Sequence, residues 1–257
     1  MTTLRLLFAP ALAMTISSGC AALLPAPTPM ASLQYQRQAD QPKRCLLLML
    51  PGRGDRADDY AKHGFIEALQ KRPLEVDAVA ANAVVGYYAR RTLLERLRED
   101  VLEPAKAQGY EQVWVVGISM GGLGSLLYAK EHPGFAGVVL LAPFLGDEAV
   151  IEEIEKVGGL GKWAPPAEIA RDDYQRDLWR WLKGAVEKGQ PRLLLGFGEQ
   201  DFMARSHRLL AAALPEGSTF RTEGKHDWGT WSRLWNRLLD DSELARACAA
   251  PAPVAAE

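Results

Sequence analysis

One short segment of the chain could supply a nucleophile: the sequence GISMG at positions 117–121. An apolar run over residues 112–118 predicts a buried strand before Ser119, and a helical pattern follows it. The glycines leave room for a sharp strand-to-helix turn that projects the Ser119 hydroxyl above a sheet. The pattern therefore indicates nucleophilic attack by a serine. The alternative interpretation is a glycine-rich turn that only packs closely.

A serine hydroxyl is a weak nucleophile at neutral pH and needs a neighbouring base. His226, in the segment GKHDW, lies on a loop between the last predicted strand and the last predicted helix. The other three histidines lie in or at the ends of predicted helices, with His207 expected on an exposed one; they are His63, His132 and His207. His226 is therefore the predicted base.

The base in turn needs a carboxylate that fixes its tautomer and stabilises the imidazolium. Asp201, in the segment GEQDF, directly follows the predicted strand at residues 191–198. Parallel strands bring their carboxyl ends to one edge of a sheet, and Ser119, Asp201 and His226 can converge there. Asp201 is the predicted carboxylate, and Glu199 and Asp147 are the alternatives.

Negative charge that develops on a substrate oxygen needs hydrogen-bond donors. The segment LPGRGD, at residues 50–55, follows the first strongly apolar run. The backbone N–H of Arg53 in this segment and that of Met120, directly after the serine, are the predicted oxyanion donors. Gly52 and Gly54 would let the backbone turn toward the serine.

Apolar runs and helical patterns alternate along the chain, which predicts an α/β fold of three layers, with a mostly parallel sheet and helices on both faces. The strands are predicted at residues 44–50, 74–83, 112–118, 137–143, 191–198 and 218–224, with residues 32–38 as a further candidate.

Residues 146–190 interrupt this alternation and predict a small helical cap over one end of the sheet. Tyr87 and Tyr88, after the second strong strand, and Trp228, after the predicted base, are the predicted substrate-binding residues, with ordinary packing in the core or cap as the alternative for each. The tryptophans of the cap, which either close the pocket or pack in the core, are Trp163, Trp179 and Trp181.

From about residue 44 to 240 the chain resembles a small bacterial α/β-hydrolase of the serine esterase or lipase type. The shared motifs are LPGRGD, GISMGG, GEQD and GKHDW, in that order. The order Ser, Asp, His is the one found in this superfamily. Such enzymes often have His where this chain has Pro51.

The resemblance implies an α/β-hydrolase fold and a serine carboxylesterase that forms an acyl-enzyme on Ser119, with no metal or other cofactor. A small-molecule ester with a short or medium acyl chain is the expected substrate. Two other interpretations remain: a peptidase or amidase with the same triad, and a catalytically silent surface-binding module.

The bulk composition is that of an ordinary globular protein. The 257 residues are 48% hydrophobic, enough for one sizeable core, and the formal net charge is −2. So weak a charge gives no strong field toward nucleic acid or an anionic membrane. We expect a monomer that binds no nucleic acid.

The first twenty residues are typical of a secretory signal, with Arg5 before an apolar run that is too short to span a bilayer. The segment ISSGC resembles a bacterial lipoprotein signal, which would make Cys20 the lipidated first residue of the mature chain. Ordinary secretion and a retained segment are the alternatives. The expected location is the bacterial cell envelope, anchored by lipid to the outer membrane, or else the periplasm or exterior.

The remaining domain boundaries follow from the same pattern. Residues 21–33 predict an extended Pro-rich tether, and residues 34–257 the hydrolase domain. The last predicted helix should run from the active edge of the sheet to the opposite edge, where the strand at residues 44–50 begins. Cys45 and Cys248 would then lie at the same edge, either as a disulfide or as free thiols.

Overall fold

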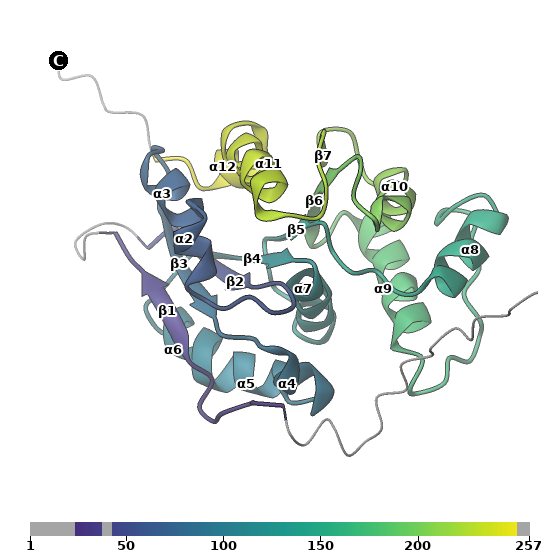
Figure 1. The fold of residues 1–257 in the computed structure, drawn as a ribbon, viewed down its shortest axis with the longest axis horizontal. Helices are drawn as coiled ribbons and strands as arrows, with labels where there is room; N and C mark the ends of the chain where they lie inside the picture. The colour runs from purple at the N-terminus through teal and green to yellow at the C-terminus, as the bar shows by residue number, and fades with distance from the viewer. Residues whose placement is uncertain (1–23, 38–42, 251–257) are drawn as a thin grey trace, which may run out of the picture.

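The computed structural model describes residues 24–37 and 43–250. A seven-stranded sheet runs through the molecule in the order β1-β3-β2-β4-β5-β6-β7 (Figure 1). All neighbouring strands are parallel except β1, which is antiparallel to β3. The strands are β1 (Ser32–Tyr35), β2 (Cys45–Leu50), β3 (Val76–Ala81), β4 (Gln112–Ile118), β5 (Gly137–Leu141), β6 (Arg192–Gly198) and β7 (Thr219–Thr222).

Helices cover both faces of the sheet, so alternate side chains of each central strand enter two separate cores. Leu46, Leu48 and Leu50 of β2 belong to one core, and Leu47 and Met49 to the other. Helices of the first core are α4 (Val85–Ala89), α5 (Leu93–Arg96), the π-helical η1 (Leu97–Leu102), α6 (Glu103–Lys106), α7 (Met120–Glu131), α8 (Glu148–Lys156), α9 (Tyr174–Lys188) and α10 (Ala204–Ala211). Helices of the second are α2 (Asp59–Lys62), α3 (Phe65–Gln70), α11 (Trp228–Asp241) and α12 (Glu243–Ala247).

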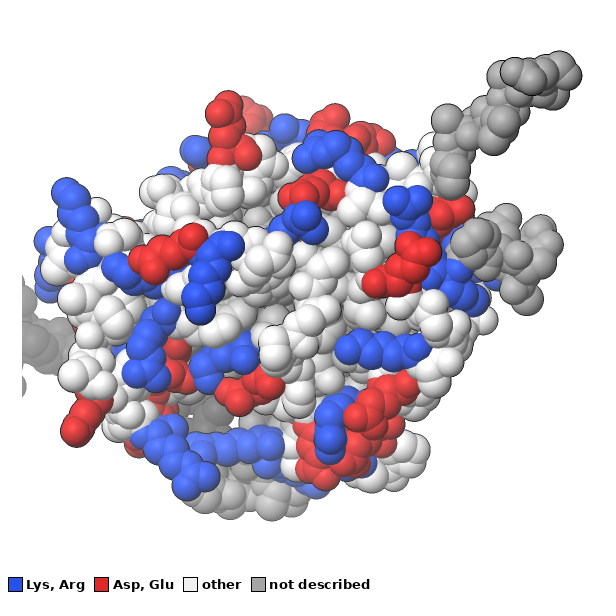
Figure 2. All heavy atoms as spheres, turned by 180° about the vertical axis from the view of Figure 1, so that it is seen from behind, with Lys and Arg blue, Asp and Glu red and all other residues white. Residues whose placement is uncertain are grey.

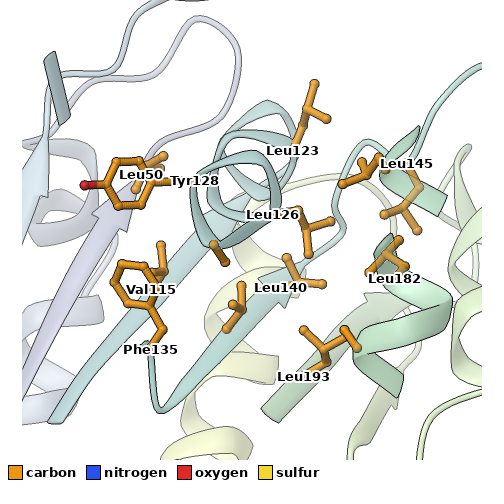
Figure 3. Close-up of a cluster of buried hydrophobic side chains, with 14 of the residues drawn as sticks. Leu50, Val115, Leu123, Leu126, Tyr128, Phe135, Leu140, Leu145, Leu182 and Leu193 are labelled. Carbon is orange, nitrogen blue, oxygen red and sulfur yellow. The ribbon is translucent and has the colours of Figure 1, made fainter. Parts of the chain in front are cut away.

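The predicted three-layer α/β architecture is therefore confirmed. Figure 3 shows the first core, where Leu126 of α7 lies beside Leu140 of β5, and Val115 of β4 lies near Tyr128 and Phe135. Strands buried on both faces carry near-continuous apolar runs, which is why the sequence indicated them clearly. This packing fixes α7, and hence the residue just before it, relative to the ends of the strands.

The segment before β1 packs against the domain. The Tyr87 hydroxyl donates to the carbonyl oxygen of Pro27 at 2.6 Å, and the Met30 amide donates to Asp100 Oδ2 at 2.7 Å. Strand β1 begins at Ser32, so the hydrolase domain begins before residue 34, the predicted boundary. Residues 24–31 are therefore a docked strap on α4 and η1.

The segment predicted as a cap contributes mainly to the core. Leu178, Trp179 and Leu182 of α9 are buried against one face of the sheet. The Trp179 indole donates to the carbonyl oxygen of Leu145, and the buried Trp163 indole donates to Glu153. Neither indole closes a pocket, because both rings are fully buried in the first core.

The surface carries charges of both signs. Figure 2 shows basic and acidic side chains interspersed over the face seen from behind. Ion pairs join such residues in the described part of the chain, for example Arg176 and Glu153. Among the described residues, no helix is both long and apolar enough to cross a membrane.

Cys45 and Cys248 form a disulfide, with their Sγ atoms 2.06 Å apart and both side chains fully buried. The bond joins the start of β2 to the end of α12 across 203 residues of sequence. The backbone reinforces it, because the Glu75 amide donates to the carbonyl oxygen of Cys248 at 2.7 Å.

Removing this disulfide should lower the free energy of unfolding by about 2–5 kcal/mol, since it closes a very long loop and so restricts the unfolded chain. Urea unfolding of the oxidised protein, the reduced protein and the Cys45→Ala/Cys248→Ala variant measures this. The reduced protein and the variant should share a lower midpoint. Equal midpoints for oxidised and reduced protein would contradict the prediction.

Candidate active site

Ser119 occupies a strained turn between β4 and α7. Its φ of 52° and ψ of −114° lie in a region that non-glycine residues rarely adopt. The surrounding backbone holds it there: the Ser119 amide donates to the carbonyl oxygen of Leu141 at 2.9 Å, and the Phe144 amide donates to that of Ser119 at 3.0 Å. The last residue of β5 and the loop that follows it thus hold the turn through hydrogen bonds.

The two glycines of the GISMG segment are required by close backbone packing. A Cβ atom at Gly121 would lie 2.0 Å from the carbonyl oxygen of Leu50, and one at Gly117 would lie 2.3 Å from that of Gly121. Real Cβ atoms do not approach so closely, so any side chain at either position would displace the turn. The glycine-rich pattern therefore builds the sharp turn itself.

The structure brings the three predicted catalytic residues together. His226 Nε2 lies 3.0 Å from Ser119 Oγ, and His226 Nδ1 lies 2.7 Å from Asp201 Oδ2. An ionised carboxylate can only accept, so Nδ1 carries the proton and Nε2 is free to accept from the serine hydroxyl. This is the arrangement in which an imidazole can take a proton from a serine.

Asp201 is held rigidly below the imidazole. Its side chain is fully buried, whereas that of His226 is 16% exposed. Asp201 Oδ1 accepts from the Met203 amide at 2.8 Å, so both carboxylate oxygens have partners. A buried carboxylate with both oxygens satisfied can orient the imidazole without turning away.

The loops that carry Asp201 and His226 are joined through glycine. The Gln200 amide donates to the carbonyl oxygen of Gly224 at 3.0 Å, and the Gly224 amide donates to Gln200 Oε1 at 2.5 Å. A Cβ atom at Gly198 would lie 2.3 Å from the carbonyl oxygen of Gly224. The two strand ends can approach this closely only because Gly198 lacks a side chain, whereas a Cβ atom at Gly224 would lie 2.2 Å from Thr230 Oγ1.

The alternative carboxylates lie elsewhere. Glu199 pairs with Arg208 on the surface, and Asp147 exchanges hydrogen bonds with Gln175 at the start of α8. The hydrogen bond to His226 comes from Asp201.

The predicted oxyanion loop passes beside the serine. A Cβ atom at Gly52 would lie 3.7 Å from the Cβ atom of Ser119, and the loop turns through a hydrogen bond from the Asp55 amide to the carbonyl oxygen of Gly52. Arg53 follows in this loop with its side chain exposed. Met120 is the first residue of α7, where backbone amides have no partner within the helix.

Trp228 connects the histidine loop to the oxyanion loop. Its indole N–H donates to Asp55 Oδ1 at 3.3 Å, and its ring stacks on His63 with 4.3 Å between centroids. Burial raises the pKa of the Asp55 carboxyl, although the hydrogen bond from Trp228 opposes this. Trp228 therefore lies at the edge of the site, where it positions these two loops.

The prediction for Tyr87 is wrong. Its ring is fully buried and its hydroxyl is bonded to the strap at Pro27, so no substrate can reach it. Tyr88, the other tyrosine of the prediction, does contact the site, because its hydroxyl donates to the carbonyl oxygen of Met120 at 3.2 Å. Helix α4 begins at Val85, and its turn separates the two rings.

His207 was expected on an exposed helix face, and it is fully buried. Its Nε2 lies 2.9 Å from the carbonyl oxygen of Pro143, and its Nδ1 has no hydrogen-bond partner among the described residues. Burial lowers the pKa of His207 to about 4, although the Pro143 contact opposes this shift. The neutral imidazole thus braces the loop whose Phe144 amide holds Ser119.

One residue at the site was not identified from the sequence. The Phe202 ring lies 4.8 Å from the His226 ring, centre to centre, and is 78% exposed. Its position directly after Asp201 was the only available signal, and an aromatic residue in a loop is not by itself informative.

A family model of known proteins matches part of this chain and is consistent with the α/β fold described above. This model, described as serine aminopeptidase, S33, matches residues 92–187, a segment that includes Ser119 and ends before Asp201. Among curated proteins, no sequence is significantly similar to this chain.

Solved structures with the same fold cover most of the chain. The S-formylglutathione hydrolase FrmB of Staphylococcus aureus is 17% identical, with a TM-score of 0.55 over 85% of this chain and 95% of its own. Est1E of Butyrivibrio proteoclasticus is 18% identical, with a TM-score of 0.54 over 82% and 91%. An S-formylglutathione hydrolase of Agrobacterium tumefaciens is 12% identical, with a TM-score of 0.54 over 88% and 98%. Together with the strand order, these likenesses show that the chain has the α/β-hydrolase fold.

The buried His207 makes stability depend on pH. Its pKa is about 4 in the folded protein and about 6.5 in an unfolded chain, so between these values the unfolded state binds more protons. Stability should therefore fall as the pH decreases from 6.5 toward 4. The slope of the urea midpoint against pH should be shallower in His207→Gln, whose amide keeps a donor for Pro143. Equal slopes would contradict the prediction.

Proposed function

We propose that the chain is a serine hydrolase that cleaves carboxylic esters through an acyl-enzyme on Ser119. The observation that carries this proposal is the continuous hydrogen-bonded line from Ser119 Oγ through His226 to the buried Asp201. The strained turn supports it, since a strand-to-helix turn of this kind presents the serine at the edge where the other two residues converge.

In the proposed mechanism, Ser119 Oγ attacks the ester carbonyl carbon while His226 Nε2 takes the hydroxyl proton. The C–O bond to the alcohol then breaks, and the protonated imidazole gives its proton to the departing oxygen. Water repeats the attack on the acyl-enzyme, with His226 again as base, and releases the acid. Asp201 remains ionised and holds the imidazolium in place.

The amides of Arg53 and Met120 would stabilise the oxyanion. The approach of Gly52 to Ser119 supports the first, and the start of α7 directly after the serine supports the second. Donors fixed in advance lower the barrier because no reorganisation is needed as charge develops. Backbone amides also make this role independent of the residue at position 51, where Pro51 stands in this chain.

A short or medium acyl ester is the proposed substrate. Among the structural neighbours, one is named a ferulic acid esterase and two are S-formylglutathione hydrolases, which favours oxygen and sulfur esters over amides. The family model described as a serine aminopeptidase favours the second candidate, a peptidase or amidase with the same triad. The third candidate is a catalytically silent binding module, in which the hydrogen-bonded triad would have no catalytic role.

We also propose that the chain is a monomer attached to the bacterial envelope through a lipid on Cys20, which lies outside the described residues. The full-length chain made in a bacterial host should then enter the detergent phase of a Triton X-114 partition, and Cys20→Ser should stay in the aqueous phase. Finding both proteins in the aqueous phase would contradict the lipid anchor and leave secretion or retention.

Ser119→Ala should lower kcat for an ester by about a millionfold if the triad acts as a unit, and His226→Ala by a similar factor. His132→Ala is the matched control, because His132 packs on Tyr128 at the far end of α7 and should keep wild-type rates.

Rates are to be measured on a butyrate ester and on the butyramide of a matched aromatic amine. Ester cleavage lost in both triad variants supports the proposal. Faster cleavage of the amide would favour the peptidase or amidase, and no cleavage of either substrate by folded wild type would favour the binding module.

A further inference from the structure

Phe202 is a large apolar residue whose side chain is exposed to solvent. At 78% it is the most exposed large apolar side chain of the described residues. A single exposed aromatic needs no explanation in itself. Here, however, the ring lies against the imidazole of His226, with the two planes inclined by 59°. An apolar surface is thus held open to solvent beside the predicted base.

The backbone on both sides of Phe202 is fixed by the triad carboxylate. Asp201 Oδ1 accepts from the Met203 amide, the carbonyl oxygen of Asp201 accepts from the Ala204 amide at 2.9 Å, and the Asp201 amide donates to Gly198. The backbone that carries Phe202 is therefore held in place, so a ligand that contacts its ring would not have to order the loop.

The chemistry of acylation determines which part of a substrate lies there. His226 Nε2 must pass its proton to the departing alcohol oxygen, so that oxygen lies within hydrogen-bond distance of the imidazole. Trp231, which is buried, also packs against this imidazole, with 5.0 Å between centroids and the two planes nearly perpendicular. The space that the buried Trp231 fills is closed to the alcohol portion, whereas the exposed Phe202 ring beside the same imidazole is open to it.

We propose, resting on the proposed ester hydrolysis, that Phe202 contacts the alcohol portion of the substrate and selects esters of aryl or other apolar alcohols. An aromatic ring on the departing oxygen would pack against the exposed face of Phe202 and remove both surfaces from water. A methyl group would be too small to reach it. Selection by Phe202 would act on the alcohol, and the acyl group would contact other residues.

Two esters of the same acid distinguish contact with the alcohol portion from an effect on the acyl group, because phenyl butyrate and methyl butyrate give the same acyl-enzyme. In Phe202→Ala, kcat/KM for phenyl butyrate should fall about tenfold relative to wild type, an effect of the size expected for one lost aromatic contact with its buried area. The value for methyl butyrate should change less than twofold, and the rate of hydrolysis of the common acyl-enzyme should not change.

Leu33→Ala is the matched control, since Leu33 is 41% exposed on β1, the outermost strand on the side of the sheet away from β6 and β7. Phe202→Leu should recover part of the preference for the phenyl ester. Equal losses of kcat/KM for both esters, with a shifted pH profile, would mean that Phe202 only positions His226, and would overturn the inference. Unchanged kcat/KM for both esters would also overturn it. If folded wild type cleaves neither ester, the proposed function itself fails.

Discussion

The structure of the site depends on one strained residue. Ser119 has a positive φ that costs on the order of 1–3 kcal/mol, and only a closely packed environment can hold such a residue. That environment is the contact of Gly121 with the backbone of Leu50, together with the hydrogen bonds of Ser119 to the end of β5 and to the loop that follows it. The burial of α7 against the parallel strands supplies the stability that offsets this strain.

The convergence of the other two residues follows from the topology. Strands β4, β6 and β7 are parallel, so the residues after them meet at one edge although they are far apart in the sequence. Glycine at position 198 then lets the backbone at Gly224 approach closely, and Asp201 and His226 lie within hydrogen-bond distance. The buried His207 braces the same edge by contacting Pro143. Close backbone contacts, more than charge, therefore set the geometry of the triad.

The sequence predicted those features that follow from periodicity and local motifs. Buried parallel strands carry continuous apolar runs, so the α/β class and the convergence of Ser119, Asp201 and His226 could be inferred. Side-chain direction could not: Tyr87 and Tyr88 are adjacent, and only the start of α4 decides which one is buried. The burial of His207 and the contact of Phe202 with His226 arise from long-range packing, which leaves no local signal.

The central claim is that His226 and Asp201 activate Ser119, and a fluorophosphonate tests it most directly because the reagent needs an activated serine but no particular substrate. Folded protein is incubated with the reagent, and peptide mass mapping locates the adduct. The account predicts one adduct, on Ser119, that is absent in Ser119→Ala and greatly slowed in His226→Ala. No adduct on folded wild type, or an adduct on another serine, would contradict it.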